Sequence, residues 1–230
     1  MNLIRTGLFL VLFCLLGCFS ENIEITEDLR VQVSGNVSGA DDLGNKEVFS
    51  FAGLENSFFS NYHKSEMLGK GRMDGAGNFE FMSLSPEYRD IQILFNSDYS
   101  ENYDDDFESV FVVIESYKDK QVTLPDINIG RSAKIKLRIK NTSGIQEASY
   151  EIIYTQPGRY LVYDNGELNE FEPELLNPGR IIGDISQEIY EEEFSSLPGT
   201  EVRLLLSYGE QQEERIFTIQ PGVNSYEIEF

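Results

Sequence analysis

The stretch SAKIKLRIKN, from Ser132 to Asn141, carries the clearest structural pattern in the chain. Ile135, Leu137 and Ile139 alternate in it with lysine and arginine. Successive side chains of a β-strand point to opposite faces, so this period of two predicts a strand with one buried face and one solvated face. The pattern therefore indicates a β-sheet that covers a core on one side only.

Similar segments follow toward the C-terminus, separated by the turn sequences QPG, DNG, LPG and QPG. In these turns Pro presets φ and Gly accepts positive φ. The sequence predicts a hairpin that carries Tyr154, Tyr160 and Tyr163, and a packed Phe230 at the end of the last strand. The predicted strands of this half are 132–141, 149–155, 159–163, 201–208, 214–219 and 225–230.

The pattern weakens between residues 168 and 193. NPGRIIGDISQEI predicts a turn followed by a strand, whereas SQEIYEEEF fits either a short helix or an acidic strand.

Strand patterns also dominate the part of the chain that precedes Ser132. Ser109–Tyr117 is apolar enough for burial on both faces, and no segment has a helical period and length. The predicted strands of this half are 30–39, 78–84, 90–96, 109–117 and 121–129. Many short strands predict an all-β chain with two consecutive antiparallel β-sandwich domains, 30–130 and 131–230, divided near Gly130.

The N-terminal residues predict a signal peptide. Arg5 is followed by an apolar run, Gly7–Leu16, that is about half of the roughly 20 residues needed to span a bilayer. The next residues complete the tetrad LLGC, Leu15–Cys18, which resembles a bacterial lipobox. The resemblance implies a signal peptide at 1–17, a lipidated Cys18 and a tether at 18–29. Cys14 would leave with the signal, so the mature chain would have no disulfide.

The lipobox resemblance also implies a location. Acyl chains on Cys18 would attach the protein to a membrane, the first partner that the sequence predicts. Position 19 is Phe and not the Asp associated with inner-membrane retention, which implies the outer membrane, on its periplasmic or cell-surface face. The acidic triplets SEN and TED behind the cysteine resemble surface-export signals.

The first predicted domain resembles the transthyretin-like fold of carboxypeptidase regulatory-like modules. The resemblance is carried by VSGNVSGADDLGNKEV and GRMDGAGNFEFMSLSP, which cover a Gly-rich first strand and a later Asp/Gly turn before two alternating phenylalanines. It departs after Pro86, where Glu87, Tyr88 and Arg89 replace the Gly-Tyr of the family.

The formal charge of −22 excludes several partners. Nucleic-acid binders need a basic stripe, and an acidic surface is repelled by anionic lipid and by acidic substrates. The sequence predicts no cofactor and no nucleic-acid partner.

Two acidic segments are candidates for calcium binding, because calcium prefers several oxygen ligands. In DGAGN, Asp74–Asn78, the glycines and the asparagine are those of a tight turn, which is the preferred interpretation. In YSENYDDDFE the calcium candidates are Asp104, Asp105, Asp106 and Glu108. Consecutive acids point to alternate sides and repel one another, so a solvated loop is preferred there.

The remaining candidate residues are a histidine and several tyrosines. His63 has no G-x-S-x-G elbow or second histidine to support a catalytic or zinc site, so a packing role is favoured. Tyr99 and Tyr103 beside the acids could bind a glycan or a protein, whereas Tyr154, Tyr160 and Tyr163 in strands are typical of cross-strand packing.

These observations favour a non-enzymatic envelope lipoprotein that serves as an interaction or structural accessory module, with an envelope protein or a glycan as partner. The alternative is a carbohydrate-binding or nutrient-uptake-associated surface lipoprotein. A third hypothesis is a carboxylate-dependent hydrolase, because the separation of paired acids is invisible in a sequence.

Overall fold

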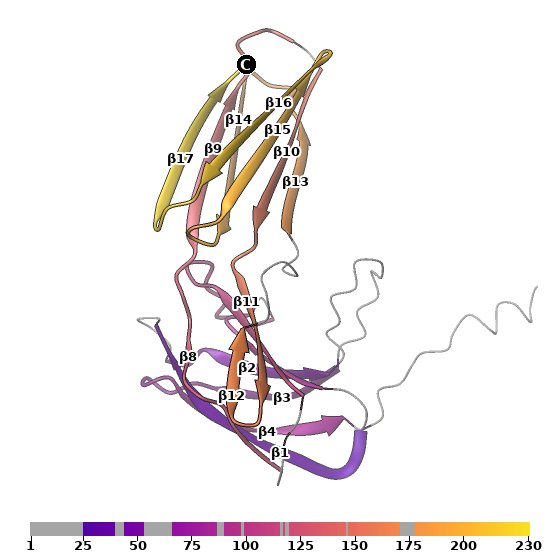
Figure 1. Cartoon of the computed structure of the whole chain (residues 1–230), viewed down its shortest axis with the longest axis vertical. Helices are drawn as coiled ribbons and strands as arrows, with labels where there is room; N and C mark the ends of the chain where they lie inside the picture. Colours follow the sequence, from indigo (N-terminus) through magenta and orange to yellow (C-terminus); the bar gives the residue numbers. More distant parts are fainter. Residues whose placement is uncertain are drawn as a thin grey trace, which may run out of the picture.

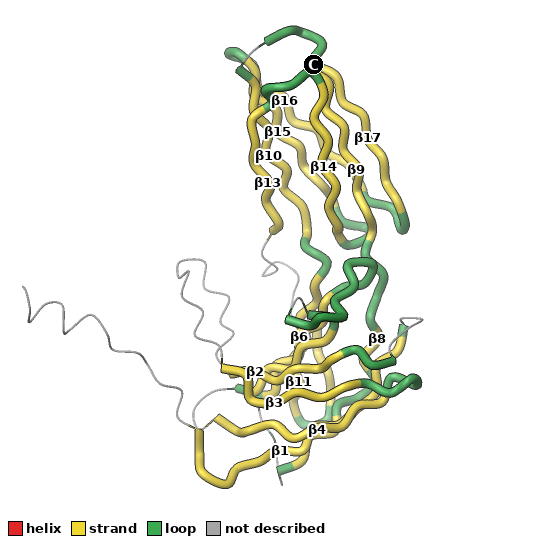
Figure 2. Tube along the Cα trace, turned by 180° about the vertical axis from the view of Figure 1, so that it is seen from behind, coloured by secondary structure: helices red, strands yellow, loops and turns green. Residues whose placement is uncertain are grey.

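A computed structural model describes the chain outside residues 1–24 and several internal segments. Cys14, Cys18 and His63 lie outside the described residues, as do residues 87–89. Within the described part, a search for apolar helices of membrane-spanning length finds none. All regular elements described there are strands (Figure 2). The described residues are 25–39, 44–52, 66–86, 90–97, 99–115, 117, 120–145, 147–170 and 178–230.

Two sheets form the first sandwich, which we define as strands β1–β8 together with β11 and β12 (Figure 1). The smaller sheet has the order β4-β1-β7, with β8 also paired to β1, and the larger sheet has the order β12-β11-β6-β5-β2-β3. The smaller sheet contains β1 (Ile25–Ser38), β4 (Asn78–Pro86), β7 (Gln121–Thr123) and β8 (Ile127–Asn128). The larger contains β2 (Glu47–Ala52), β3 (Glu66–Arg72), β5 (Ile91–Phe95), β6 (Ser109–Ile114), β11 (Gly158–Asp164) and β12 (Glu167–Glu170).

The core of the first sandwich lies between these sheets and combines phenylalanines with β-branched residues. Val33 of β1 and Phe81 of β4 face Ile93 of β5 across the interface, and all three belong to one buried cluster. β4 alternates between exposed and buried positions from Asn78 to Ser85, which confirms the period of two predicted for this stretch. Burial of apolar surface on one face of each sheet is what joins the two layers.

The hairpin β11–β12, Gly158–Glu170, comes from the later half of the chain but belongs to the first sandwich. β11 pairs in parallel with β6, with Leu161 opposite Val112. Leu161 is 5% exposed and contributes to the first core. We call this segment the crossing hairpin. β10 pairs with β13 and β15 instead of β11, so the prediction that Tyr154, Tyr160 and Tyr163 share one hairpin was wrong.

The second sandwich is made of two further sheets, ordered β14-β9-β17 and β13-β10-β15-β16. Its core is rich in isoleucine and leucine, with Ile135 and Ile139 of β9 facing Ile152 of β10 and Leu204 of β15. Its strands are β9 (Ala133–Lys140), β10 (Ala148–Thr155), β13 (Pro178–Asp184), β14 (Ile189–Ser196), β15 (Glu201–Tyr208), β16 (Gln211–Thr218) and β17 (Val223–Glu229).

The predicted all-β fold class is confirmed. β9 buries its isoleucines and leucine and keeps its basic side chains outward, as its alternation predicts, and Phe230 packs on the second core. The strand β14 covers residues 189–194 of SQEIYEEEF, which removes the helical alternative. The antiparallel pattern dominates, but four parallel pairings occur, namely β1 with β7, β1 with β8, β6 with β11 and β9 with β17.

Burial in β6 differs from the prediction. The strand alternates between half-buried and buried positions, so Ser109–Tyr117 is not buried on both faces. Its outward Phe111 packs beside a small second cluster of Phe49, Phe51 and Leu94 on the outer face of the larger sheet. This outer cluster explains why the sequence of β6 is almost continuously apolar.

The two sandwiches are stacked along the long axis of the molecule (Figure 1). The C-terminal end of β17 lies at the end of the second sandwich that is farthest from the first. We call the contact region between the sandwiches the junction.

Candidate site at the junction between the sandwiches

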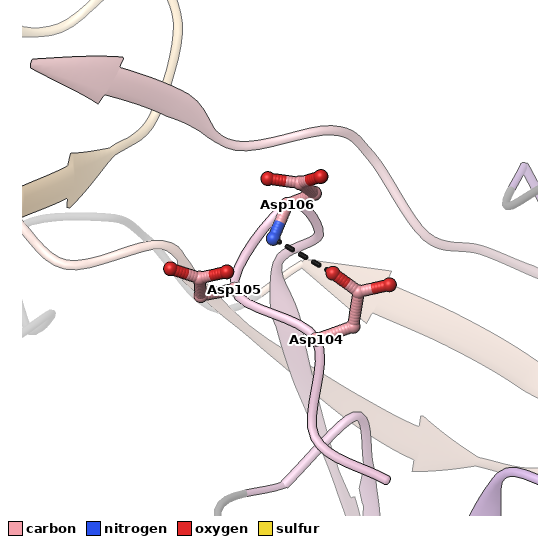
Figure 3. Close-up of side chains that lie close together, drawn as sticks. All are labelled: Asp104, Asp105 and Asp106. Carbon is pink, nitrogen blue, oxygen red and sulfur yellow. Dashed lines mark hydrogen bonds between the residues drawn. The ribbon is translucent and has the colours of Figure 1, made fainter.

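The three consecutive aspartates of the predicted calcium segment lie at the junction. One carboxylate oxygen of each of Asp104, Asp105 and Asp106 lies within 4.8 Å of the others (Figure 3). The amide N–H of Asp106 donates to Oδ1 of Asp104 at 3.0 Å, which closes the turn that gathers the three side chains. We call Asp104–Asp106 the acidic loop.

Lysines from both sandwiches reach the acidic loop. Nζ of Lys46, at the start of β2, lies 3.4 Å from Oδ2 of Asp104. Nζ of Lys134, in β9 of the second sandwich, pairs with Asp105 and lies 3.4 Å from Asp106. Burial lowers the pKa of Lys134, but hydrogen bonds and charge from the two aspartates outweigh it and leave the pKa raised. The loop is therefore an ionic link between the sandwiches.

Glu108, the fourth calcium candidate, does not join the aspartates. Its side chain is 9% exposed and lies 3.0 Å from Nη2 of Arg159 in the crossing hairpin. Oε1 of Glu108 also accepts the amide N–H of Gly130 at 2.7 Å. Arg159 donates further to the carbonyl of Asn128 and pairs with Glu170 at 3.2 Å. This arrangement fastens the crossing hairpin to β6 and to the segment that leads into the second sandwich.

Backbone contacts reinforce the same region. The amide N–H of Ser132 donates to the carbonyl of Asp106 at 2.9 Å, and the amide of Ser109 donates to the carbonyl of Pro157 at 2.8 Å. Phe107 and Arg131 form an isolated antiparallel bridge, with the guanidinium 4.9 Å from the ring centroid. The chain passes between the sandwiches after β8, after β10 and after β12, so the junction is crossed three times.

This geometry decides what the acidic loop can do chemically. Calcium takes six to eight oxygen ligands. The three aspartates already have two lysines as counter-charges, so the loop is built to join sandwiches through ion pairs. A group of neighbouring acids is not sufficient to assign a metal site, and we assign none to this loop.

The Asp74–Asn78 segment forms the turn that the sequence favours. The Asp74 carboxylate accepts the amide N–H groups of Ala76 at 2.8 Å and of Asn78 at 2.9 Å, and the side-chain amide of Asn78 at 3.0 Å. These hydrogen bonds, those of Asn78 first, lower the pKa of Asp74 against a smaller opposing effect of burial. The Asp74 side chain therefore shapes the turn.

The candidate tyrosines are not one site. Tyr99, 52% exposed, packs on Phe51 at 4.9 Å between ring centroids, and Tyr103 is 42% exposed. Tyr160 stacks on Phe111 of β6 at 4.7 Å, which adds to the attachment of the crossing hairpin. Tyr163 packs on the first core and Tyr154 on the second, as cross-strand packing predicts.

Sequence reasoning missed a polar group inside the second sandwich. The hydroxyl of Tyr150 donates to Tyr190 and lies 3.0 Å from Oε1 of Glu192, to which Tyr190 also donates. Burial is the largest cause that raises the pKa of Tyr150, followed by these hydrogen bonds. The available signal was the strand alternative for SQEIYEEEF, which would place Tyr190 and Glu192 on the same face.

A charged hollow on the outer face of β14-β9-β17 was also missed. The basic side chains of β9 form a central column there, with glutamates of β14 and β17 on either side, around a space of about 430 Å³. Lys136 lies 3.4 Å from Glu193, and Arg138 lies 3.3 Å from Glu191 and 3.6 Å from Glu227. Lys136, Arg138 and Lys140 of the basic face predicted for β9 are thus paired within their own sheet, whereas Lys134 pairs with the acidic loop.

Comparison with known proteins gives no relative by sequence. No protein-family model matches the chain, and no curated protein matches it. Among solved structures, the chain is similar to a shaft pilin from Lactobacillus rhamnosus GG, with 10% identity, a TM-score of 0.29 and coverage of 87% of this chain and 98% of that one. A fimbrial protein from Bacteroides ovatus matches with 9% identity, a TM-score of 0.26 and coverage of 90% and 50%.

A 9R-lipoxygenase from Cyanothece is also similar over 54% of this chain and 20% of that one, with 15% identity and a TM-score of 0.30. The matches thus include surface proteins and an enzyme, and their TM-scores are too low to support an argument about function.

Proposed function

We propose that the chain is a non-enzymatic envelope lipoprotein that acts as a structural or interaction accessory module. In this proposal Cys18 carries the lipid and the two sandwiches extend from the outer membrane. The partner is an envelope protein that contacts the sandwiches.

The junction is the observation that supports the proposal. Ion pairs, backbone hydrogen bonds and three chain passages are concentrated where the sandwiches meet. Such an arrangement resists bending between two bodies, as a spacer or presenting module requires. The acidic side chains there are engaged in these links, which favours a mechanical role over general acid–base chemistry.

The lipid anchor is tested with two matched cysteine variants of the full chain. We expect Cys18→Ser to abolish incorporation of radiolabelled fatty acid and to release the protein from the membrane fraction. Cys14→Ser should leave both unchanged, because this residue would leave with the signal. Retention of Cys18→Ser in the membrane with its label would contradict the proposed location.

The partner is tested by capture from solubilised envelope, read by mass spectrometry, with the wild-type chain as bait. We expect an envelope protein that is recovered in stoichiometric amounts and is lost when the junction is loosened by Lys134→Ala. A glycan array is the parallel experiment. Reproducible binding to an oligosaccharide without protein capture would replace the proposal with the carbohydrate-binding alternative.

A further inference from the structure

The last strand, β17, is held by one neighbour. Among the described strands it lies at the edge of its sheet and pairs only with β9, in parallel, through seven register pairs from Val223 opposite Lys134 to Glu229 opposite Lys140. Both strands run from the junction toward the far end of the second sandwich (Figure 1). Tension between the first sandwich and the end of β17 therefore loads this strand pair and its packing, together with the chain that leads back from β17 to β16.

Backbone hydrogen bonds close both ends of the pair. At the junction end, the amide of Lys134 donates to the carbonyl of Gly222 at 3.0 Å, and at the far end the amide of Phe230 donates to the carbonyl of Lys140 at 3.1 Å. The Phe230 carbonyl also accepts from the amide of Thr142 at 2.8 Å and from its hydroxyl at 2.9 Å. The end of β17 is thus fixed to the segment that follows β9.

Side chains hold β17 on both of its faces. On the outer face, Lys140 pairs with Glu227 and, at 3.3 Å, with Glu229. On the inner face Ile228 is 3% exposed, and Phe230 stacks on Tyr208 with ring centroids 4.8 Å apart. The ion pairs of Lys140 lie toward the far end, where tension on the end of β17 would first act.

We propose that β9 and β17 form a shear clamp that carries tension applied between the first sandwich and the end of β17. Tension from the first sandwich pulls β9 toward its start, at the junction, while tension from the far end pulls β17 toward its last residue. The two strands are then pulled in opposite directions along their length. Their hydrogen bonds lie across the direction of pull, so they share the load and must break together.

The same pair is weak when it is pulled from the junction end of β17. A force applied at Pro221 separates the two strands at one end, so that the hydrogen bonds break one after another. This contrast follows from the parallel register and does not depend on the proposed lipid anchor. It can therefore be tested on the full chain independently of the proposed function.

The test is single-molecule force spectroscopy on the full chain with Cys14 and Cys18 replaced by serine. One handle is fixed at the N-terminus, and the other is attached through a thiol placed either after Phe230 or at Pro221→Cys. We expect the second sandwich to survive at least about tenfold longer at constant force with the handle after Phe230, equivalent to ~1.4 kcal/mol in the barrier. The contour length released identifies which sandwich opened. Equal lifetimes for the two attachments would overturn the proposal.

Two double variants sharpen the test. Glu227→Gln with Glu229→Gln removes the ion pairs across β9 and β17 and should shorten the lifetime only when the handle is after Phe230. The matched control is Glu191→Gln with Glu193→Gln, which removes ion pairs between β9 and β14 outside the loaded pair. An equal loss from both double variants would contradict the assignment of the load to β17.

Discussion

The two sandwiches are completed in different ways. The second is built from residues between Ala133 and Glu229 and needs no strand from elsewhere in the described chain. The first lacks an edge of its larger sheet until the crossing hairpin arrives from the other side of the junction. The first sandwich is therefore not formed by one continuous segment of the chain. It depends on residues that come after the start of the second sandwich in the sequence.

Their buried polar groups differ as well. The first sandwich buries the carboxylate of Glu47, which lies 2.6 Å from Lys70 and accepts from the hydroxyl of Ser100 at 3.3 Å. The second buries the hydroxyl of Tyr150 beside Glu192. One sandwich is therefore sensitive to the protonation of an acid and the other to the ionisation of a phenol.

Arg159→Ala is expected to produce the largest difference in stability between the two sandwiches. The change leaves the Glu108 carboxylate buried without its cation and should lower the free energy of unfolding of the first sandwich by about 3–5 kcal/mol. Chemical denaturation followed by residue-resolved NMR would separate the two sandwiches. The control is Arg203→Ala in the second sandwich, whose ion pair with Glu214 is exposed and should contribute no more than about 1 kcal/mol. Equal losses from the two variants would contradict the role given to the crossing hairpin.

A second variant should destabilise the second sandwich and leave the first unchanged. A Cβ at Gly183 would overlap the phenol of Tyr150, so Gly183→Ala should destabilise the second sandwich by about 1–3 kcal/mol in thermal or denaturant unfolding. Gly75 in the first sandwich has nothing within 4 Å of the added methyl group, and Gly75→Ala should be neutral or stabilising by less than about 1 kcal/mol. A neutral Gly183→Ala would show that Tyr150 does not lie over β13 as described.

The two sandwiches should lose stability at opposite ends of the pH range, the first in acid and the second in alkali. The pKa of Glu47 is lowered, mainly by the hydrogen bond from Lys70 and against the effect of burial, so its stabilisation is present above its unfolded value of 4.5 and is lost as pH falls through the folded pKa. The pKa of Tyr150 is raised, first by burial, so its stabilisation is present below 10.0 and is lost as pH rises above that value.

Hydrogen exchange measured near pH 4 and after brief exposure to pH 11 would test this contrast. We expect the first sandwich to lose protection in acid and the second in alkali. Glu47→Gln should weaken the acid dependence of the first sandwich alone, and Tyr150→Phe the alkaline dependence of the second alone. Parallel loss in both sandwiches at either pH would contradict the assignment of these groups.

The smallest effect is expected from calcium. Each aspartate of the acidic loop is already paired with Lys46 or Lys134, so millimolar calcium should leave the thermal midpoint of both sandwiches unchanged within error in a calorimetric titration. Magnesium at the same ionic strength is the control for general screening. A rise in the midpoint specific to calcium would show that the ion displaces the lysines and that the junction is a metal site.

Local patterns were sufficient to predict most strands. The alternation in β9 and in β4 gives strand type, face and burial, because a period of two has one structural interpretation. β2, β3 and β12 received no such prediction. All six residues of β2 are buried, including Phe49 and Phe51 on the outer face, so β2 lacks the alternation of buried and exposed residues that predicts a strand.

Long-range pairing could not be predicted. QPG at residues 156–158 has the composition of a hairpin turn, yet here it connects β10 of one sandwich to β11 of the other. Composition predicts the turn, but it does not predict which strand will pair with the strand that follows the turn. For the same reason, the sequence could group Asp104–Asp106 with Glu108 only as calcium candidates in a solvated loop. The pairing of the aspartates with Lys134 and the separate pairing of Glu108 with Arg159 came only from the fold.

The place of the crossing hairpin is tested most directly by residue-resolved hydrogen exchange of Leu161→Ala, with Leu204→Ala as the matched variant in the second core. Leu161 belongs by sequence to the later half of the chain and by packing to the first core. We predict that Leu161→Ala accelerates exchange in β5 and β6 while β9 and β15 keep their protection, and that Leu204→Ala does the reverse. Loss of protection in β9 and β15 from Leu161→Ala, with β5 and β6 unchanged, would contradict the account.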